Sequence, residues 1–265
     1  MHPKLLEIGG FFLPTYGVLL VLAYLLALRV SVKLAEKDGI NGQKIFDMGL
    51  WMLIAALAGA KLFSVFVDWE YYMEYPRELV GLLRLGGVFY GGFLCAALAG
   101  IWYIHRHALP FWRVADIFAV ALPLGQAVGR VGCLAAGCCY GKPAAWGFSI
   151  TFRDAFAHRY IGVPMNIPLY PTQIYLSVTD LLVFAVMCLL FGRRTYAGRV
   201  FGWFLVVSSV FRFALEYLRG DPRGTFMSTA LSTSQGVSLI LALLGAALLL
   251  YLRKAHRHAS RKAPA

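Results

Sequence analysis

Apolar runs of about 20 residues constrain the fold of this chain more than any other feature. Each is long enough, at about 1.5 Å per residue, to cross the roughly 30 Å hydrocarbon core of a bilayer as a helix. They cover residues 12–32, 46–67, 88–104, 114–135, 172–191, 199–218 and 233–252. Only 14% of the 265 residues are charged, whereas soluble domains carry roughly a quarter charged residues. The sequence therefore predicts an all-α polytopic membrane protein with about seven transmembrane helices.

The segments outside these runs predict the domain organisation. No repeat or low-complexity linker interrupts the chain, so residues 1–252 are expected to form a single transmembrane domain. Two long connections, near 69–87 and 140–171, are expected on the outer side, and residues 253–265 are expected to form a disordered basic cytoplasmic tail. The first apolar run is too long for the core of a cleavable signal peptide, so it is expected to stay as a membrane helix.

The distribution of Lys and Arg predicts the orientation. The chain has 25 Lys and Arg against 13 Asp and Glu. In a soluble protein this excess would suggest nucleic acid, but in a membrane protein it indicates basic cytoplasmic loops. The connections after the first, third and fifth runs, together with the C-terminal tail, hold more Lys and Arg than the other connections. We therefore expect the N-terminus outside, the C-terminus in the cytoplasm, and no nucleic-acid partner.

Ionisable side chains occur inside the predicted helices, where each costs a few kcal/mol unless it is paired or hydrated. They are Lys61, Asp116, Arg130, Asp180, Arg212 and Glu216. Four of these fall in the outer half of their helices, together with two tyrosines: Lys61, Arg130, Arg212, Glu216, Tyr16 and Tyr90. We expect this group to form a polar cavity that opens toward the outer leaflet and suits an anionic lipid headgroup. A structural ion pair is the alternative, and it is the preferred reading for Asp116.

Glycines and cysteines are concentrated between residues 125 and 141. The glycines permit close helix packing or an irregular turn that lines a cavity. Arg130 lies among them and favours a phosphate site, because a guanidinium binds phosphate through two hydrogen bonds. Cys133, Cys138 and Cys139 have neither C-x-x-C spacing nor nearby histidines, so neither a metal site nor a cofactor is expected. Whether these cysteines are free or bridged stays open.

Six short motifs follow one another along the chain. They are Tyr16-Gly17, Gly59-Ala60-Lys61-Leu62, Gly91-Gly92, Gly129-Arg130-Val131-Gly132 with Gly141 further on, Pro171-Thr172-Gln173-Ile174-Tyr175, and Phe211-Arg212 with Glu216 and Arg219. In order and in residue type, these motifs resemble those of the prolipoprotein diacylglyceryl transferases. These are seven-helix enzymes of the bacterial cytoplasmic membrane, and the resemblance covers nearly the whole chain.

The resemblance implies a membrane transferase without a cofactor. It would move a diacylglyceryl group from phosphatidylglycerol to a cysteine thiol of a lipoprotein precursor and release glycerol phosphate. The implied catalytic residues are Tyr90, Arg130, Arg212 and Glu216. The implied substrate-binding residues are Tyr16, Lys61, Gly91, Gly92, Gly129, Gly132, Cys133, Gly141, Gln173, Tyr175 and Arg219. The implied partners are phosphatidylglycerol, the lipoprotein precursor or another acceptor, and membrane lipids. The implied location is the bacterial cytoplasmic (inner) membrane, with the active site facing the outer leaflet.

Three departures from the family pattern concern the acceptor. One is Cys138-Cys139, which lie near further polar and acidic positions of the family. Tyr90 stands where the family has the histidine of its His-Gly-Gly element, and Cys133 replaces the asparagine of its Gly-Arg-x-Gly-Asn signature. A tyrosine with a pKa near 10 is a weak base, so the identity of the general base is open. A family paralogue with a different acceptor is therefore one alternative. A non-catalytic lipid-binding protein or a transporter is another, although no inverted repeat supports transport.

Overall fold

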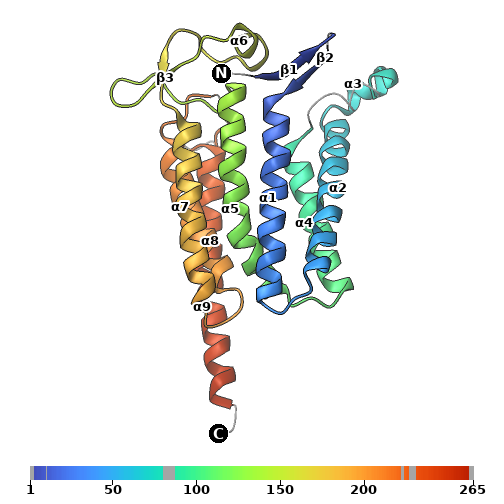
Figure 1. Ribbon diagram of the computed structural model, residues 1–265, viewed down its shortest axis with the longest axis vertical. Helices are drawn as coiled ribbons and strands as arrows, with labels where there is room; N and C mark the ends of the chain where they lie inside the picture. Colours follow the sequence, from blue (N-terminus) through green and yellow to red (C-terminus); the bar gives the residue numbers. More distant parts are fainter. Residues whose placement is uncertain (1–2, 10, 80–86, 222–223, 227–230, 263–265) are drawn as a thin grey trace. The chain divides into compact units, whose positions relative to one another are not determined.

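The computed structural model of the protein describes residues 3–9, 11–79, 87–221, 224–226 and 231–262, and it is mostly helical (Figure 1). The long helices in these ranges are α1 (Thr15–Lys37), α2 (Gly42–Val67), α4 (Phe89–Arg106), α5 (Phe111–Ala136), α7 (Thr172–Gly192), α8 (Arg199–Glu216) and α9 (Thr233–Lys262). Each coincides with one predicted apolar run. By length and composition, 5 of them can cross a membrane, namely α1, α2, α5, α7 and α9. The prediction of an all-α polytopic membrane protein is confirmed. The number of crossings, expected to be about seven, and their directions stay predictions.

Short elements complete the described chain. Strands β1 (Lys4–Ile8) and β2 (Phe11–Pro14) form an antiparallel hairpin, with Lys4 opposite Pro14 and Ile8 opposite Phe11. The others are α3 (Trp69–Glu74), the 3-10 helix η1 (Pro76–Leu79), α6 (Ala155–Ile161), and the paired strands β3 (Ile150–Thr151) and β4 (Pro168–Leu169). The sequence did not predict these sheets, because strands of two to five residues are too short to show a clear alternation.

The chain divides into two compact units. Unit 1 comprises Met1–Val30 and Ala115–Ala265, and unit 2 comprises Ser31–Val114. The sequence predicts one domain over residues 1–252. The divisions fall inside α1 and at the start of α5, where no linker composition marks a boundary.

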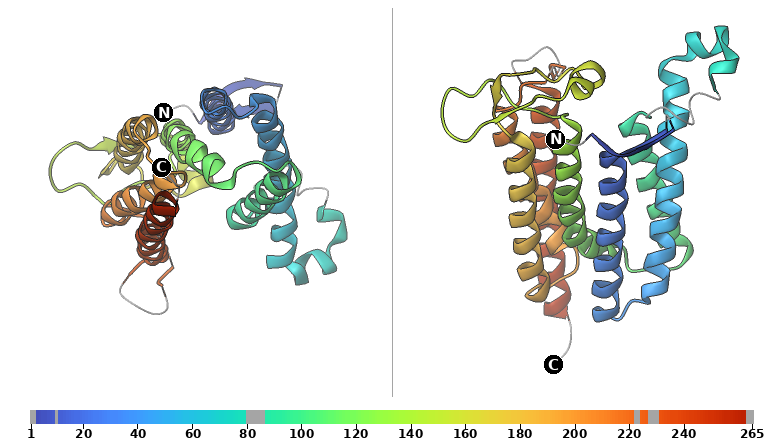
Figure 2. Two further views of the ribbon diagram at one scale, coloured as in Figure 1. Left: turned by 90° about the horizontal axis from the view of Figure 1, so that it is seen from below. Right: turned by 45° about the horizontal axis from the view of Figure 1, so that its top comes forward.

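In unit 2, α2 and α4 pack along their length (Figure 2). Glycines let the two backbones come close. A Cβ atom at Gly91 would lie 2.3 Å from the Phe63 side chain, and one at Gly92 would lie 2.8 Å from the Ala56 carbonyl oxygen. The motif Gly91-Gly92 is thus explained by helix packing.

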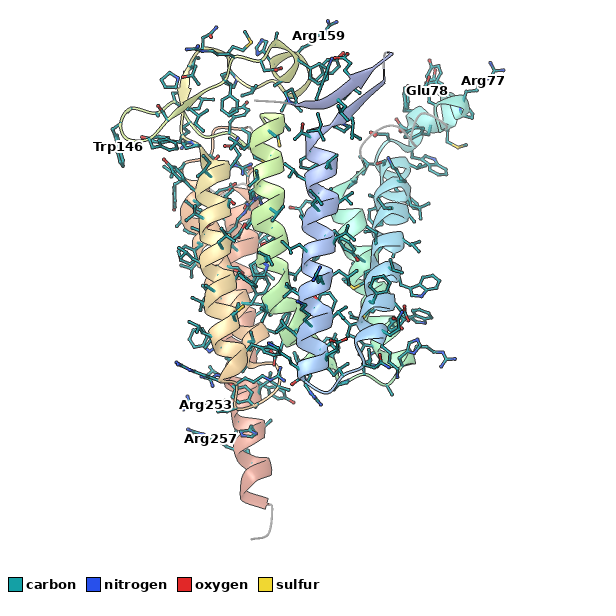
Figure 3. All side chains as sticks on the ribbon, viewed as in Figure 1. Arg77, Glu78, Trp146, Arg159, Arg253 and Arg257 are labelled. Atoms are coloured by element: carbon teal, nitrogen blue, oxygen red, sulfur yellow. The ribbon has the colours of Figure 1, made fainter. Side chains whose placement is uncertain are left out.

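The predicted outer segment 69–87 begins with α3 and η1, which follow the end of α2 and carry the exposed residues Arg77 and Glu78 (Figure 3). Residues 80–86 of this segment lie outside the described residues.

In unit 1, a buried carboxylate joins α5 to the start of α8. Asp116 accepts hydrogen bonds from the backbone amides of Gly198, at 2.8 Å, and Phe201, at 2.9 Å. The Arg194 guanidinium lies 3.7 Å from the same carboxylate, which is fully buried. Asp116 therefore has a structural role, as expected from the sequence. Its carboxylate fixes the first turn of α8.

The two ends of unit 1 differ in character. The loop between α5 and α7 contains a small core of Phe152, Ala157, Val163 and Leu169 and carries Trp146 and Arg159 at one end (Figure 3). Arg253 and Arg257 of α9 lie at the other end (Figure 3). The sequence predicts a disordered tail from residue 253, but α9 continues to Lys262. This stretch contains no glycine or proline that would end a helix.

Candidate functional site

A tight turn at the end of α5 brings three cysteines together. Gly137 adopts a positive φ of 84°, and the backbone amides of Gly137 and Cys138 both donate to the Cys133 carbonyl, at 2.9 and 3.2 Å. This left-handed glycine cap reverses the chain over the helix end. The Sγ atoms of Cys133, Cys138 and Cys139 consequently lie within 4.8 Å of one another.

The first turn of α7 holds the two loop cysteines in place. Thr172 Oγ1 donates to the Cys139 carbonyl at 2.6 Å, and Gln173 Nε2 donates to the Cys138 carbonyl at 2.7 Å. Both side chains are fully buried. Gln173, predicted to bind substrate, is thus engaged with the loop through its Nε2 group, while its Oε1 atom has no hydrogen-bond partner among the described residues. Cys139 itself has a positive φ of 61°, a conformation uncommon outside glycine.

Gly141 places the end of this loop against the segment after α8. It pairs with Arg219 as an antiparallel bridge, and Lys142 N donates to the Leu218 carbonyl at 2.9 Å. A Cβ atom at Gly141 would lie 2.4 Å from the Tyr170 carbonyl oxygen. Gly141 is therefore needed for a close approach of three backbone segments, and this approach brings Arg219 next to the cysteines.

Two guanidinium groups accompany the cysteines. Arg130 Nη1 donates to Cys139 Sγ at 3.9 Å. Arg219 is buried and donates two hydrogen bonds of 2.8 Å to the Asp221 carboxylate. Its Nη1 atom has no hydrogen-bond partner among the described residues, and its charge interacts with Cys139. The sequence predicted Arg219 as a substrate-binding residue but missed its partner Asp221.

The pKa values of the two loop cysteines, Cys138 and Cys139, shift in opposite directions. Hydrogen bonds from the Cys133 and Cys138 thiols lower the pKa of the Cys139 thiol; burial opposes this shift, and the charges of Arg219 and Arg130 support it. The Cys138 thiol donates to the Cys133 carbonyl oxygen at 3.7 Å. Its pKa is raised by its interactions with the neighbouring Cys133 and Cys139 side chains and by burial. This difference favours Cys139 as the thiolate of the group.

A second polar group lies where α8 ends and α9 begins. Arg212 Nε donates to Ser234 Oγ at 3.1 Å, and Ser232 Oγ donates to Glu216 Oε1 at 3.1 Å. The half-buried carboxylate of Asp180 on α7 interacts electrostatically with Arg130 and with Arg212. These interactions link the two predicted catalytic arginines. The sequence shows Asp180 as an ionisable residue within an apolar run but does not assign it to the site.

A cavity of about 120 Å³ lies between α5 and α7. Its lining combines one cationic and two polar side chains with apolar ones, from Arg130, Val131, Leu134, Gln173, Ile174, Ser177 and Val178. This mixture suits the junction between a phospholipid headgroup and its acyl chains.

Other predicted residues of unit 1 surround this region. A Cβ atom at Gly132 would lie 3.2 Å from the Tyr16 ring, so these two residues are neighbours. At Gly129 a Cβ atom would meet nothing within 4 Å. The Tyr175 hydroxyl donates to the Phe148 carbonyl at 3.1 Å and so holds the loop between α5 and α7.

The remaining predicted residues belong to unit 2. Lys61 is half-buried on α2, and Tyr90 is 67% exposed at the start of α4. Their participation, with Gly91 and Gly92, in a common site with Arg130 stays a prediction.

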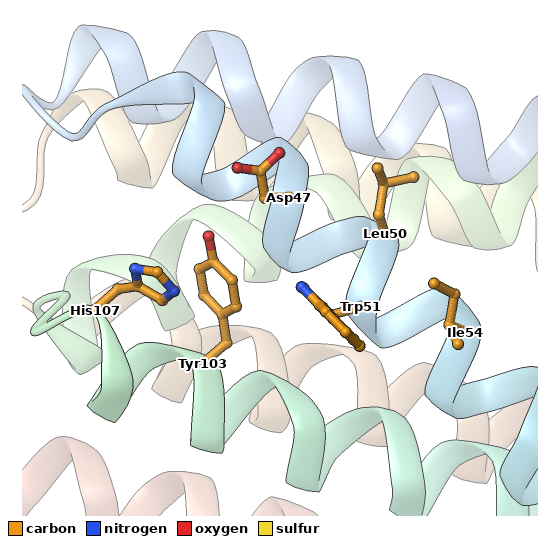
Figure 4. A pocket seen from close by; sticks show the side chains of 6 residues that line it. All are labelled: Asp47, Leu50, Trp51, Ile54, Tyr103 and His107. Carbon is orange, nitrogen blue, oxygen red and sulfur yellow. The ribbon is translucent and has the colours of Figure 1, made fainter.

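Unit 2 also contains a larger cavity, of about 370 Å³. It lies at the opposite end of the α2–α4 pair from Lys61 and Tyr90, and no predicted site residue lines it. Its lining residues are Asp47, Leu50, Trp51, Ile54, Tyr103 and His107 (Figure 4).

The fold and the arginine group together define the class of the protein. It is an all-α membrane protein in which the guanidinium of Arg130 lines a small cavity whose other lining residues are mostly apolar. Such an arrangement suits an anionic lipid.

Comparison with known proteins identifies the family. Residues 3–251 match the family model described as prolipoprotein diacylglyceryl transferase, and the chain belongs to this family. A relative from Clostridium tetani, named phosphatidylglycerol–prolipoprotein diacylglyceryl transferase, is 35% identical over 92% of this chain and 95% of its own. A relative with the same name occurs in Symbiobacterium thermophilum, at 30% identity over 94% of this chain and 92% of its own. One named phosphatidylglycerol–prolipoprotein diacylglyceryl transferase 2 occurs in Clostridium perfringens, at 30% identity over 94% of both chains. The resemblance seen in the motifs is confirmed.

Proposed function

We propose that this protein transfers a diacylglyceryl group from phosphatidylglycerol to the thiol of a lipoprotein-precursor cysteine. The relatives are named for this activity, and their sequence similarity covers nearly the whole chain. In the transfer, the thiol sulphur forms a bond to the glyceryl carbon, the bond from that carbon to the phosphate oxygen breaks, and glycerol phosphate leaves with the electron pair. The thiol proton passes to a base or to water.

The observation that carries this proposal is the position of Arg130. Its side chain lines the cavity between α5 and α7, and its charge, like that of Arg212, acts electrostatically on the Asp180 carboxylate. Two guanidinium groups in a low-dielectric region stabilise the negative charge that develops on a departing phosphate. Glu216 accepts a hydrogen bond from Ser232 and lies, like Arg212, where α8 ends and α9 begins.

We also propose that this site faces the outer leaflet of the bacterial cytoplasmic membrane. The end of unit 1 that carries Arg253 and Arg257 is strongly basic, as cytoplasmic ends are (Figure 3). The loop between α5 and α7 lies at the other end of the unit. Trp146→Cys and Arg257→Cys variants in intact cells test this. An impermeant thiol reagent is expected to label position 146 and not position 257, and the reverse pattern would contradict the orientation.

A purified-protein assay tests the activity. The protein is incubated with phosphatidylglycerol and a peptide that carries a lipoprotein-precursor cysteine, and both glycerol phosphate release and the mass gain of the peptide are measured. We expect both in equal amounts. Release without modification of the peptide would favour the alternative of a different acceptor. No release by the unsubstituted protein would overturn the transferase proposal.

A further inference from the structure

The three sulphur atoms at the end of α5 form a compact group of soft ligands. The Sγ atoms of Cys133, Cys138 and Cys139 lie within 4.8 Å of one another, and all three thiols are free. In a tetrahedral zinc site each Zn–S bond is about 2.3 Å, which places the sulphurs about 3.8 Å apart. Each sulphur therefore has to shift by at most about 0.6 Å to reach that geometry.

The ligand type points to zinc. A set of sulphur ligands without oxygen or nitrogen excludes the hard cations magnesium and calcium. Zinc sites with three protein ligands keep a fourth position for water or substrate. We propose that Cys133, Cys138 and Cys139 bind one zinc ion and leave its fourth position open for the acceptor thiol.

The surrounding structure holds these ligands as a metal site requires. Metal ligands depend on neighbouring hydrogen bonds that fix their positions. Thr172 and Gln173, both fully buried on α7, donate to the carbonyls of Cys139 and Cys138. Cys139 has a positive φ, a conformation that non-glycine residues rarely adopt, so the surrounding structure holds it in place.

The charges around the group match a zinc–thiolate centre. A zinc ion with three thiolates carries one net negative charge, and a bound acceptor thiolate adds a second. Arg130 donates to Cys139, and the buried Arg219 interacts with the same sulphur. These two cations offset the negative charges in a region where uncompensated charge is costly.

The zinc site gives the proposed reaction its thiolate, and in this respect the inference rests on the proposed function. An acceptor thiol that binds zinc loses its proton to water. Its sulphur then forms the bond to the glyceryl carbon as the carbon–oxygen bond to the phosphate breaks, and the neutral thioether product dissociates. Arg130 both lines the cavity and contacts Cys139, so the proposed zinc ligands and the cavity have a common neighbour.

Metal analysis of the purified protein tests the site without any activity measurement. The protein, kept reduced, is dialysed against zinc and then against buffer, and bound metal is measured by mass spectrometry. We expect one zinc per chain, and cobalt in its place should give the absorption of a tetrahedral thiolate site. Cys133→Ser, Cys138→Ser and Cys139→Ser are each expected to weaken metal binding at least about tenfold. The matched control Cys188→Ser, on the exposed face of α7, is expected to bind as the unsubstituted protein does.

Three results would overturn the site: no retained zinc, retained zinc that the three serine variants do not reduce, or a disulfide among these cysteines that resists alkylation until it is reduced. Stoichiometric copper would overturn the choice of metal. The results that would reject the proposed function differ from those that would reject the zinc site. Zinc binding without any transfer would leave the site standing and reject the transferase, whereas transfer that survives complete removal of zinc would reject the role of the metal.

Discussion

Arg130 Nη1 donates to the sulphur of Cys139 at 3.9 Å, although the two residues lie in different secondary-structure segments. The Gly137 turn makes this contact by folding the chain back over the end of α5. One guanidinium thus lies beside both the group of three cysteines and the cavity between α5 and α7. A residue in this position affects phosphate binding and sulphur chemistry together.

Substitution of Arg130 is expected to remove most of the transferase activity. Arg130→Ala should lower the rate of glycerol phosphate release by roughly 10²–10³-fold, the usual cost of losing a group that stabilises developing charge. Arg130→Lys should recover part of the rate, because it keeps the charge but loses the planar fork. Cys188→Ala serves as the control and should retain full activity. Equal rates for Arg130→Ala and the control would contradict the assignment of Arg130.

Thr172 is expected to stabilise the cysteine loop. Thr172→Val leaves the Cys139 carbonyl without its 2.6 Å hydrogen bond and should lower the free energy of unfolding by about 1–3 kcal/mol. Thr179→Val is the matched control, because Thr179 Oγ1 bonds only within its own helix, to the carbonyls of Tyr175 and Leu176. Denaturant unfolding in detergent measures both variants. A loss at Thr179 as large as that at Thr172 would argue against a special role for the loop.

Asp116 is expected to be the most sensitive carboxylate for the stability of unit 1. Asp116→Ala removes the acceptor of two backbone amides and the carboxylate near Arg194, and it should cost about 3–5 kcal/mol. Glu7→Ala breaks the exposed pair with Lys4 and should cost less than about 1 kcal/mol. Thermal unfolding distinguishes the two variants. Similar stabilities would show that Asp116 does not fix the start of α8.

Gly91 is expected to be required for the packing of α2 against α4. An added Cβ atom would lie 2.3 Å from Phe63, so Gly91→Ala should destabilise unit 2 by about 1–3 kcal/mol through overpacking. Gly192→Ala is the control, because a Cβ atom there meets nothing within 4 Å. Unfolding followed by tryptophan fluorescence measures the difference. If Gly91→Ala were as stable as Gly192→Ala, the packing explanation for Gly91-Gly92 would fail.

The helices could be predicted from the sequence because length and apolar composition set them directly. The seven apolar runs coincide with α1, α2, α4, α5, α7, α8 and α9. In the candidate site, Arg130 and Arg212 were conspicuous as charges within apolar runs, and Gln173 and Arg219 were indicated by their motifs. The cysteine group was not predictable, because a single left-handed glycine, Gly137, determines which way the chain leaves α5. Asp221 was missed for a similar reason, since an acidic residue outside the helices carries no signal of its partner.

Cys139 is expected to react as a thiolate well below the pH at which an ordinary cysteine does. Its pKa is lowered by hydrogen bonds from Cys133 and Cys138, with support from Arg219 and Arg130. Because an acid with a lowered pKa stays ionised to lower pH, its alkylation rate should fall less steeply between about pH 9 and pH 6 than the rate of an ordinary thiol. An unshifted thiol, with a pKa near 8.5, should slow by about tenfold per unit below that value. The measurement is the rate of iodoacetamide labelling of each cysteine peptide in metal-free protein, read by mass spectrometry. Cys138, whose pKa is raised, is the internal control and should label slowly throughout this range. A Cys139 rate that falls tenfold per pH unit would contradict its assignment as the thiolate.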